Sequence, residues 1–192
     1  IFSRVYRERA GTGLFMIGLG LGSFAAGSLA DRWYARRPIL LVRAYAVCEL
    51  GIGALLHDIG KSKISDRILN KRSALNPIEF EIMKKHPKWG IEILTGTEDI
   101  PAAAYYPILQ HHERGDRSGY PSGLSLSEMH LYSRIVSIAD SFDAMTTERV
   151  YQKAMDTYPS LKIMFSLKGA YDEDALRAFV ELMGPEGLAQ VS

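Results

Sequence analysis

The composition of this 192-residue chain excludes several broad classes of protein. Hydrophobic residues make up 47% of the sequence and charged residues 23%, which excludes a disordered tail or a fibre and is typical of a folded domain with a sizeable core. The net charge of +1 gives no general attraction to nucleic acid, so we expect neither DNA nor RNA polymers as partners. The single cysteine, Cys48, lies in an apolar run and favours a reducing compartment.

Residues 12–30 are a candidate membrane span. They read TGLFMIGLGLGSFAAGSLA, carry no charge, and space Gly18 and Gly22 so that another helix can approach closely. A helix buried in a soluble core and a secretory signal are the two alternatives. The segment predicts membrane attachment of the chain through residues 12–30.

The stretch that follows resembles a membrane segment and basic loop of major-facilitator-type transporters. The matching positions are Gly27, Asp31, Arg32, Arg36 and Arg37. A second span over residues 39–56 would place the rest of the chain outside the cell and would bury the charges of Arg43 and Glu49 in the bilayer.

We therefore assign residues 39–56 to a soluble helix. The expected domains are an apolar segment with a basic loop, residues 1–38, and a helical domain, residues 39–192. A fusion of two unrelated sources, natural or not, stays open.

From about Ala54 to Gly184 the sequence pattern predicts an all-α fold, because no alternation of strand length stands out. Asn76, Pro77 and Glu79 form a capping-box arrangement, which predicts a helix that starts at Asn76.

Two further helices are expected after this one. The first should start near Pro101. The second is long, is capped by Ser125 or Ser127, and has Leu131, Ile135 and Ile138 on one stripe.

The histidines suggest a metal site. His57 and Asp58 end an apolar helical run, and mixed nitrogen and oxygen ligands suit a divalent iron, manganese or zinc ion. A single histidine–aspartate pair without other ligands is more often a pair of surface residues. The metal interpretation gains weight because Asp140 lies inside an apolar helix, where an unpaired carboxylate is unfavourable, and because four of the five histidines lie near predicted helix ends: His57, His86, His111 and His112.

The adjacent His111 and His112 pose a geometric problem. Successive residues of a regular helix diverge by about 100 degrees. Either one imidazole points away, or the pair serves two metal ions, as in two-metal hydrolytic centres. A simple helix end that carries two histidines is the plainer alternative.

Four ordered stretches, HDIGK, KKHPKWGIEIL, HHERGDRSGYPSGL and RIVSIADSFDAMTTERVY, resemble the HD-GYP subgroup of the HD-domain phosphohydrolases. The resemblance covers about residues 54–184. It implies an HD-domain helical bundle that hydrolyses the bacterial second messenger cyclic di-GMP to linear pGpG and/or GMP with a metal-activated water. It also implies a cytoplasmic catalytic domain, here a candidate for anchoring to the bacterial inner membrane, and diguanylate cyclase (GGDEF-type) proteins as candidate partners.

The resemblance assigns roles residue by residue. Lys61 and Asp58 are the expected catalytic residues, although a lysine at this spacing is more often solvated. Two or more divalent ions are implied, with iron or manganese favoured over zinc. The matching metal ligands are His57, Asp58, His86, His111, His112 and Asp140.

The loop after the paired histidines is expected to bind substrate. Glu113 would orient an imidazole, or else lie on the surface at a helix end. Guanidinium groups can grip phosphate and an aromatic ring can stack on guanine. The candidate substrate-binding residues are Arg114, Arg117, Gly119, Tyr120 and Pro121.

The chain departs from the family pattern at two places. Family members carry an additional helix before the histidine–aspartate pair, with a histidine that completes one metal site, and no histidine precedes His57 here. We therefore expect that this helix is truncated or replaced. Arg117 stands where the family usually has glycine. A catalytically degenerate module that binds nucleotide or a signalling partner, and an HD hydrolase of another phosphoester, are the alternative functions.

Overall fold

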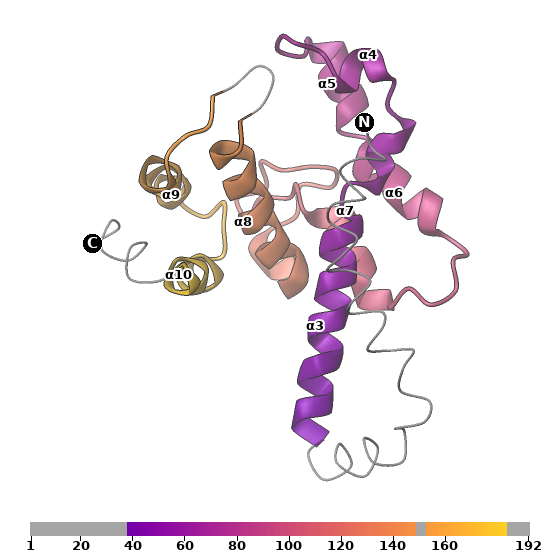
Figure 1. Ribbon diagram of the computed structural model, residues 1–192, viewed down its shortest axis with the longest axis vertical. Coiled ribbons are helices and arrows are strands. Elements are labelled where there is room, and N and C mark those ends of the chain that lie inside the picture. The colour runs from indigo at the N-terminus through magenta and orange to yellow at the C-terminus, as the bar shows by residue number, and fades with distance from the viewer. Residues whose placement is uncertain (1–37, 149–152, 184–192) are drawn as a thin grey trace. The chain divides into compact units, whose positions relative to one another are not determined.

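The computed structural model describes residues 38–148 and 153–183, and all regular secondary structure in these ranges is helical (Figure 1). An isolated bridge between Asp116 and Ser125 is the single extended pairing there. The all-α prediction is confirmed. The elements in chain order are α3 (Pro38–Leu56), η1 (Ile59–Lys63), α4 (Asp66–Leu69), α5 (Pro77–Met83), α6 (His86–Leu94), η2 (Ala102–Ala104), α7 (Tyr105–Gln110), η3 (Leu126–Glu128), α8 (Leu131–Thr146), α9 (Thr157–Ser166) and α10 (Glu173–Leu182).

The candidate membrane span, residues 12–30, lies outside the described residues. Within the described part of the chain, no helix combines the length and apolar character needed to cross a bilayer. The chain divides into two compact units, Ile1–Val47 and Cys48–Ser192. The domain boundary predicted after residue 38 stays a prediction.

The segment that begins at Asn76 forms two helices, α5 and α6. Asn76 caps α5 as expected, since its side chain accepts from the Glu79 amide and the Glu79 carboxylate accepts from the Asn76 amide. The break after Met83 follows from Pro87, which has no amide hydrogen and fits only the first turn of a new helix. His86 consequently becomes the first residue of α6 and lies fully buried.

The predicted long helix is also shorter than expected. Ser125 forms a capping box with Glu128, but it caps only the short η3. α8 starts at Leu131, where the His130 side chain accepts from the Tyr132 amide. Of the predicted apolar stripe, Ile138 is buried, whereas Leu131 and Ile135 are 52% and 36% exposed.

The main core lies where α8, α9 and α10 meet. Ile138 of α8, Met164 of α9 and Leu176 of α10 pack together with Ala170 and Tyr171 of the intervening loop. α8 also contacts α7 on its other side. It therefore connects the core to the helix that precedes the paired histidines (Figure 1).

A close approach of two backbones brings η1 against α6. A Cβ atom on Gly60 would lie 1.9 Å from the His86 carbonyl oxygen and 2.6 Å from the Gly90 nitrogen. Only glycine fits at this contact. The approach sets the His57 and Asp58 segment beside His86.

Candidate metal centre

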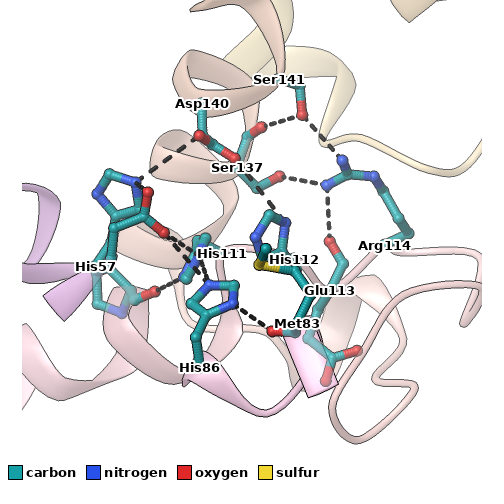
Figure 2. A network of polar contacts seen from close by, with 12 residues as sticks. His57, Met83, His86, His111, His112, Glu113, Arg114, Ser137, Asp140 and Ser141 are labelled. Carbon is teal, nitrogen blue, oxygen red and sulfur yellow. Dashed lines mark hydrogen bonds and ion pairs between the residues drawn. The ribbon is translucent and has the colours of Figure 1, made fainter. Parts of the chain in front are cut away.

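The six residues predicted as metal ligands lie together in the structure (Figure 2). Each has a nitrogen or oxygen within 3.9 Å of another member. They come from the end of α3, the start of α6, the end of α7 and the middle of α8. We call this set the histidine–aspartate cluster: His57, Asp58, His86, His111, His112 and Asp140.

Backbone carbonyls fix the ring orientation of three of these histidines. The Nδ1 atoms of His57, His86 and His111 lie 2.6, 2.8 and 2.8 Å from carbonyl oxygens three or four residues earlier in the chain. A carbonyl oxygen can only accept, so each Nδ1 carries a hydrogen and each Nε2 is turned toward the cluster, where a neutral ring offers a lone pair. This arrangement is typical of metal-binding imidazoles.

The Nε2 lone pairs converge on Asp58. Asp58 Oδ1 lies 3.3 Å from His86 Nε2 and 3.7 Å from His111 Nε2, and these two nitrogens are 3.1 Å apart. Asp58 Oδ1 is buried and accepts no hydrogen bond from the described residues. Asp58 Oδ1, His86 Nε2 and His111 Nε2 thus face one another. A cation bound between them would attract all three atoms and offset their mutual repulsion. The donor set fits a divalent transition metal.

Charge and burial set the protonation of the cluster. Burial would raise the pKa of Asp58, but contacts with the imidazoles, His111 first, and with the Lys61 ammonium hold that pKa far below its usual value. Burial lowers the pKa of His111 and of His112. For His57, burial is outweighed by the contact with Asp58, and the pKa is raised. The ionised Asp58 and the imidazoles of His111 and His112, whose lowered pKa values favour the neutral form, match the ligand state that metal binding requires.

Both adjacent histidines face the cluster. Ligand atoms of Asp58, His86, His111 and His112 all lie within 4.8 Å of one another, and this group can hold a metal ion. α7 ends at Gln110, before the pair, so the divergence of a regular helix does not separate the two rings.

Asp140 forms the other side of the cluster. Its carboxylate lies 3.8 Å from His57 Nε2 and 3.9 Å from His112 Nδ1. It projects from α8, whereas His57 and His112 follow α3 and α7. The side of the cluster made by His57, His112 and Asp140 depends on how α8 is placed against the segment that carries His112.

Lys61 also lies at the cluster. Its Nζ is 2.6 Å from Asp58 Oδ2, one helical turn along the chain. The same Oδ2 is 3.3 Å from His57 Nε2. Asp58 thus presents one oxygen to His86 and His111 and the other to a cationic side chain.

Glu113 contacts the loop and not an imidazole. Its side chain is fully buried, and its two carboxylate oxygens accept from the amides of Ser122 and Leu124 at 2.6 and 2.9 Å. The expected orienting contact with a histidine is absent from the hydrogen bonds of the described residues, and the surface alternative does not match its burial. Glu113 holds the loop that follows Pro121 against the paired histidines.

The loop of Gly119, Tyr120 and Pro121 borders the cluster. A Cβ atom on Gly119 would lie 2.3 Å from the Arg114 nitrogen, so glycine is required where this loop crosses residues 112–114. The Tyr120 ring stacks on the His112 ring at 4.7 Å, and the Tyr120–Pro121 peptide bond is cis. The Tyr120 ring packs against the His112 ring, so one face of the Tyr120 ring is covered by His112.

The two predicted phosphate-binding arginines are already engaged with protein groups. Arg114 donates to hydroxyls of α8, whereas Arg117 pairs with Glu128 at 2.8 Å and donates to the Gly123 carbonyl. Arg117 has a φ of 68°, in the left-handed region that favours glycine. Arg117 therefore adopts a backbone conformation that glycine reaches without strain.

Sequence reasoning missed several supporting residues. Ser137 and Ser141 accept from Arg114, and His130 caps α8 and stacks on Tyr106 at 4.4 Å. The available signal was the spacing of Ser137 and Ser141, four residues apart on α8 and on either side of Asp140.

Comparison with known proteins agrees with this geometry. The chain is 42% identical to a cyclic di-GMP phosphodiesterase of Thermotoga maritima over 71% of its length, and 39% identical to the 3'3'-cGAMP-specific phosphodiesterase 3 of Vibrio cholerae over 65%. These matches span 38% and 28% of the two relatives. The chain therefore corresponds to less than half of the proteins that it matches.

The fold is also similar to a solved structure. The HDG"Y"P protein Bd1817 from Bdellovibrio bacteriovorus superposes with a TM-score of 0.57 at 23% identity, over 70% of this chain and 43% of that one. A family model described as HD domain matches residues 40–175. Since this match covers well over half of the sequence and includes every member of the histidine–aspartate cluster, the chain belongs to the HD domain family.

Proposed function

We propose that the chain is a metal-dependent phosphoric diester hydrolase that opens cyclic di-GMP to linear pGpG and/or GMP. The supporting observation is the convergence of the Nε2 atoms of His57, His86 and His111 on the ionised Asp58 carboxylate, whose Oδ1 atom is buried. Several relatives are named cyclic di-GMP phosphodiesterases, which supports this substrate.

The cluster is proposed to hold two divalent ions, with manganese or iron favoured and zinc as the alternative. Bound ions supply positive charge that lowers the pKa of a water molecule and neutralises phosphate oxygens. Asp58, His86 and His111 form one side of the ligand set, and His57, His112 and Asp140 form the other. His111 and His112 can serve different ions because both rings face inward.

Lys61 is proposed to act on the phosphate. Its ammonium is fixed by Asp58 Oδ2 at the edge of the cluster and is 27% exposed, so it can approach an incoming phosphoester. Asp58 is proposed to have two roles, since one oxygen faces the imidazoles and the other orients the Lys61 ammonium.

The 119–121 loop is proposed to border the nucleotide site. Gly119 and Pro121 shape the turn, and Tyr120 is proposed to stack on guanine with the face that does not cover His112. Arg114 and Arg117 were predicted to bind phosphate. The contacts of Arg114 favour a different role, and Arg117 can bind phosphate only by releasing its exposed pair with Glu128.

The test is hydrolysis by the purified chain. The metal is removed and Mn²⁺ or Fe²⁺ is added. We then expect the chain to convert cyclic di-GMP to pGpG or GMP, and chromatography measures the product. Asp58→Asn should reduce the rate by at least about a hundredfold, because even indirect partners of metal ligands contribute roughly 10- to 100-fold. Asp66→Asn, an equivalent change on the exposed start of α4, should leave the rate unchanged. Equal rates for both variants would reject the proposal.

A second substrate follows from the relatives that are named 3'3'-cGAMP-specific phosphodiesterases. The same cluster would act on the same kind of phosphodiester, and only the base contacts would differ. Parallel assays with cyclic di-GMP and 3'3'-cGAMP at equal concentration decide between them through the ratio of kcat/KM.

A non-catalytic role is the competing proposal, because no histidine precedes His57 and one metal site lacks the family's upstream ligand. The domain would then bind the nucleotide or contact a diguanylate cyclase without hydrolysis. Metal analysis separates the two, since about two ions per chain support the hydrolase, and nucleotide binding with no metal and no product supports the module.

Attachment to a membrane is proposed from the sequence alone. The uncharged residues 12–30 support an anchor in the bacterial inner membrane, with the catalytic domain on the cytoplasmic side. Fractionation of cells that express the chain should place it with membranes, and deletion of residues 12–30 should release it. Recovery of the intact chain in the soluble fraction would contradict this.

A further inference from the structure

Arg114 contacts two segments that both carry members of the cluster. It follows His112 by two residues, and its guanidinium donates from Nη1 to the Glu113 carbonyl at 3.2 Å. Nη2 donates to the Ser141 hydroxyl at 2.9 Å, and Nη1 lies 3.5 Å from the Ser137 hydroxyl (Figure 2). One side chain thus joins the His112 segment to α8.

The two serines lie on either side of Asp140 along α8. Both are buried, at 2% and 8% exposure for Ser137 and Ser141. The Ser141 hydroxyl donates to the Ser137 carbonyl at 2.6 Å, so its hydrogen is used and its lone pairs remain for the guanidinium. The contact is therefore specific for a donor such as arginine, and it fixes the turn of helix from which Asp140 projects.

The guanidinium is also held from its face. Its Cζ lies 4.9 Å from the centre of the Tyr171 ring, which belongs to the buried core between α8, α9 and α10. With its donors on two segments and its plane on an aromatic ring, Arg114 is held from several sides.

We propose that Arg114 is a positioning residue that sets the distance between His112 and Asp140, and through it the affinity of the cluster for a divalent ion. The two side chains approach to 3.9 Å but make no hydrogen bond, so direct attraction does not hold them in place. Their separation must therefore be set by the backbone segments that carry them. Arg114 connects these segments, because it follows His112 by two residues and donates to Ser141, the residue after Asp140. This inference rests on the proposed metal-binding function of the cluster.

The test measures Mn²⁺ binding by titration calorimetry on the metal-stripped full chain, without nucleotide. Arg114→Met removes the guanidinium and keeps the aliphatic stem over Tyr171. We expect a Kd for Mn²⁺ raised roughly tenfold, the lower range for residues that orient metal ligands. The paired change Ser137→Ala with Ser141→Ala should have the same effect, and it provides the test if Arg114→Met does not fold.

Arg134→Met is the matched control. Arg134 also joins α8 to its surroundings, through Asp172 at 3.0 Å and the Met129 carbonyl, but at the start of the helix and away from Asp140. It should lower the Tm without changing the Kd for Mn²⁺. A double-mutant cycle with Asp140→Asn separates a positioning role from general destabilisation, because destabilisation would raise the Kd for Mn²⁺ whether or not Asp140 is present. Arg114→Met should change the Kd by less than about twofold when Asp140→Asn is already present.

Three results would overturn the inference: an unchanged Kd in both Arg114→Met and the serine variant, an equal loss in Arg134→Met, or a full tenfold loss on top of Asp140→Asn. The proposed function is tested separately. A chain that binds Mn²⁺ as expected but hydrolyses neither dinucleotide rejects the hydrolase and leaves the role of Arg114 standing.

Discussion

At the scale of single residues, the sequence HHER shows how four neighbours divide the tasks of one site. His111 and His112 face the cluster, Glu113 holds the loop after Pro121 through two backbone amides, and Arg114 fixes α8. The sequence predicts the histidines as ligands from their residue type and from the presence of other candidate ligands in the chain. The two charged residues could not be placed, because their partners are backbone amides and serine hydroxyls that are distant in the sequence.

Lys61 allows activity to be separated from metal binding. Lys61→Met removes the ammonium beside Asp58 Oδ2, and we expect hydrolysis of cyclic di-GMP to fall by about a hundredfold, as for the loss of one charge-stabilising donor. The Kd for Mn²⁺ should not rise, because the ammonium competes with a cation for the same oxygen. Lys63→Met is the control, since Lys63 pairs with Glu92 on the surface, away from the cluster. A weakened Mn²⁺ affinity in Lys61→Met would show that the lysine supports the metal site instead.

Arg117 tests the backbone of the loop. Its positive φ predicts that Arg117→Gly is more stable than Arg117→Ala by about 1 kcal/mol, because both variants lose the exposed ion pair with Glu128 and only glycine relieves the left-handed backbone. Urea unfolding of the two variants measures this difference. Equal stability would mean that the loop relaxes to another conformation after the substitution.

At the scale of elements, the cap at Asn76 was predictable, whereas the cap of α8 and the lengths of the helices were not. The capping box at Asn76 is confirmed because it depends on four consecutive residues. The helix that follows ends early at Met83, since Pro87 forces a restart, and this restart is what turns His86 Nδ1 toward the Met83 carbonyl. The exposed Leu131 and Ile135 show that an apolar stripe on α8 does not by itself identify the buried face.

Alanine substitution of two glycines should change stability in opposite directions, because Gly60 lies at the contact between η1 and α6 and Gly51 lies on α3 away from it. Gly60→Ala would force a methyl group into the His86 carbonyl and should destabilise the chain by about 1–3 kcal/mol, the usual range for overpacking. It should also weaken Mn²⁺ binding, because Asp58 and His86 would be pushed apart. Gly51→Ala, on α3, places a methyl group within 4 Å of no other segment among the described residues, and it should stabilise the chain by about 0.5–1 kcal/mol and leave binding unchanged. Thermal unfolding and calorimetry on both variants check these signs, and tolerance of Gly60→Ala would contradict the close backbone contact.

At the scale of the whole molecule, the cluster joins segments that are far apart in the sequence. The end of α3, the start of α6, the end of α7 and the middle of α8 each contribute members of the histidine–aspartate cluster. The all-α class was predictable from the sequence pattern, and the ordered motifs named the six residues that lie together in the cluster, whose role as metal ligands stays a prediction. The relation between these segments was not, because it depends on the Gly60 contact and on buried hydrogen bonds that have no local pattern.

Metal binding should therefore stabilise the fold as a whole. Mn²⁺ at about 100 times its Kd should add about 2.7 kcal/mol to the free energy of unfolding, because the unfolded chain cannot assemble the ligands. Thermal unfolding before and after metal removal measures this. His86→Ala should abolish the effect, and an equal Mn²⁺ effect in His86→Ala would indicate binding elsewhere.

The most direct measurement is a crystal structure of the chain grown with Mn²⁺, with anomalous differences recorded to locate the ions. We predict anomalous peaks within coordination distance of Asp58, His86 and His111 on one side and of His57, His112 and Asp140 on the other. Anomalous density elsewhere on the protein, with these six side chains free of metal, would contradict the account.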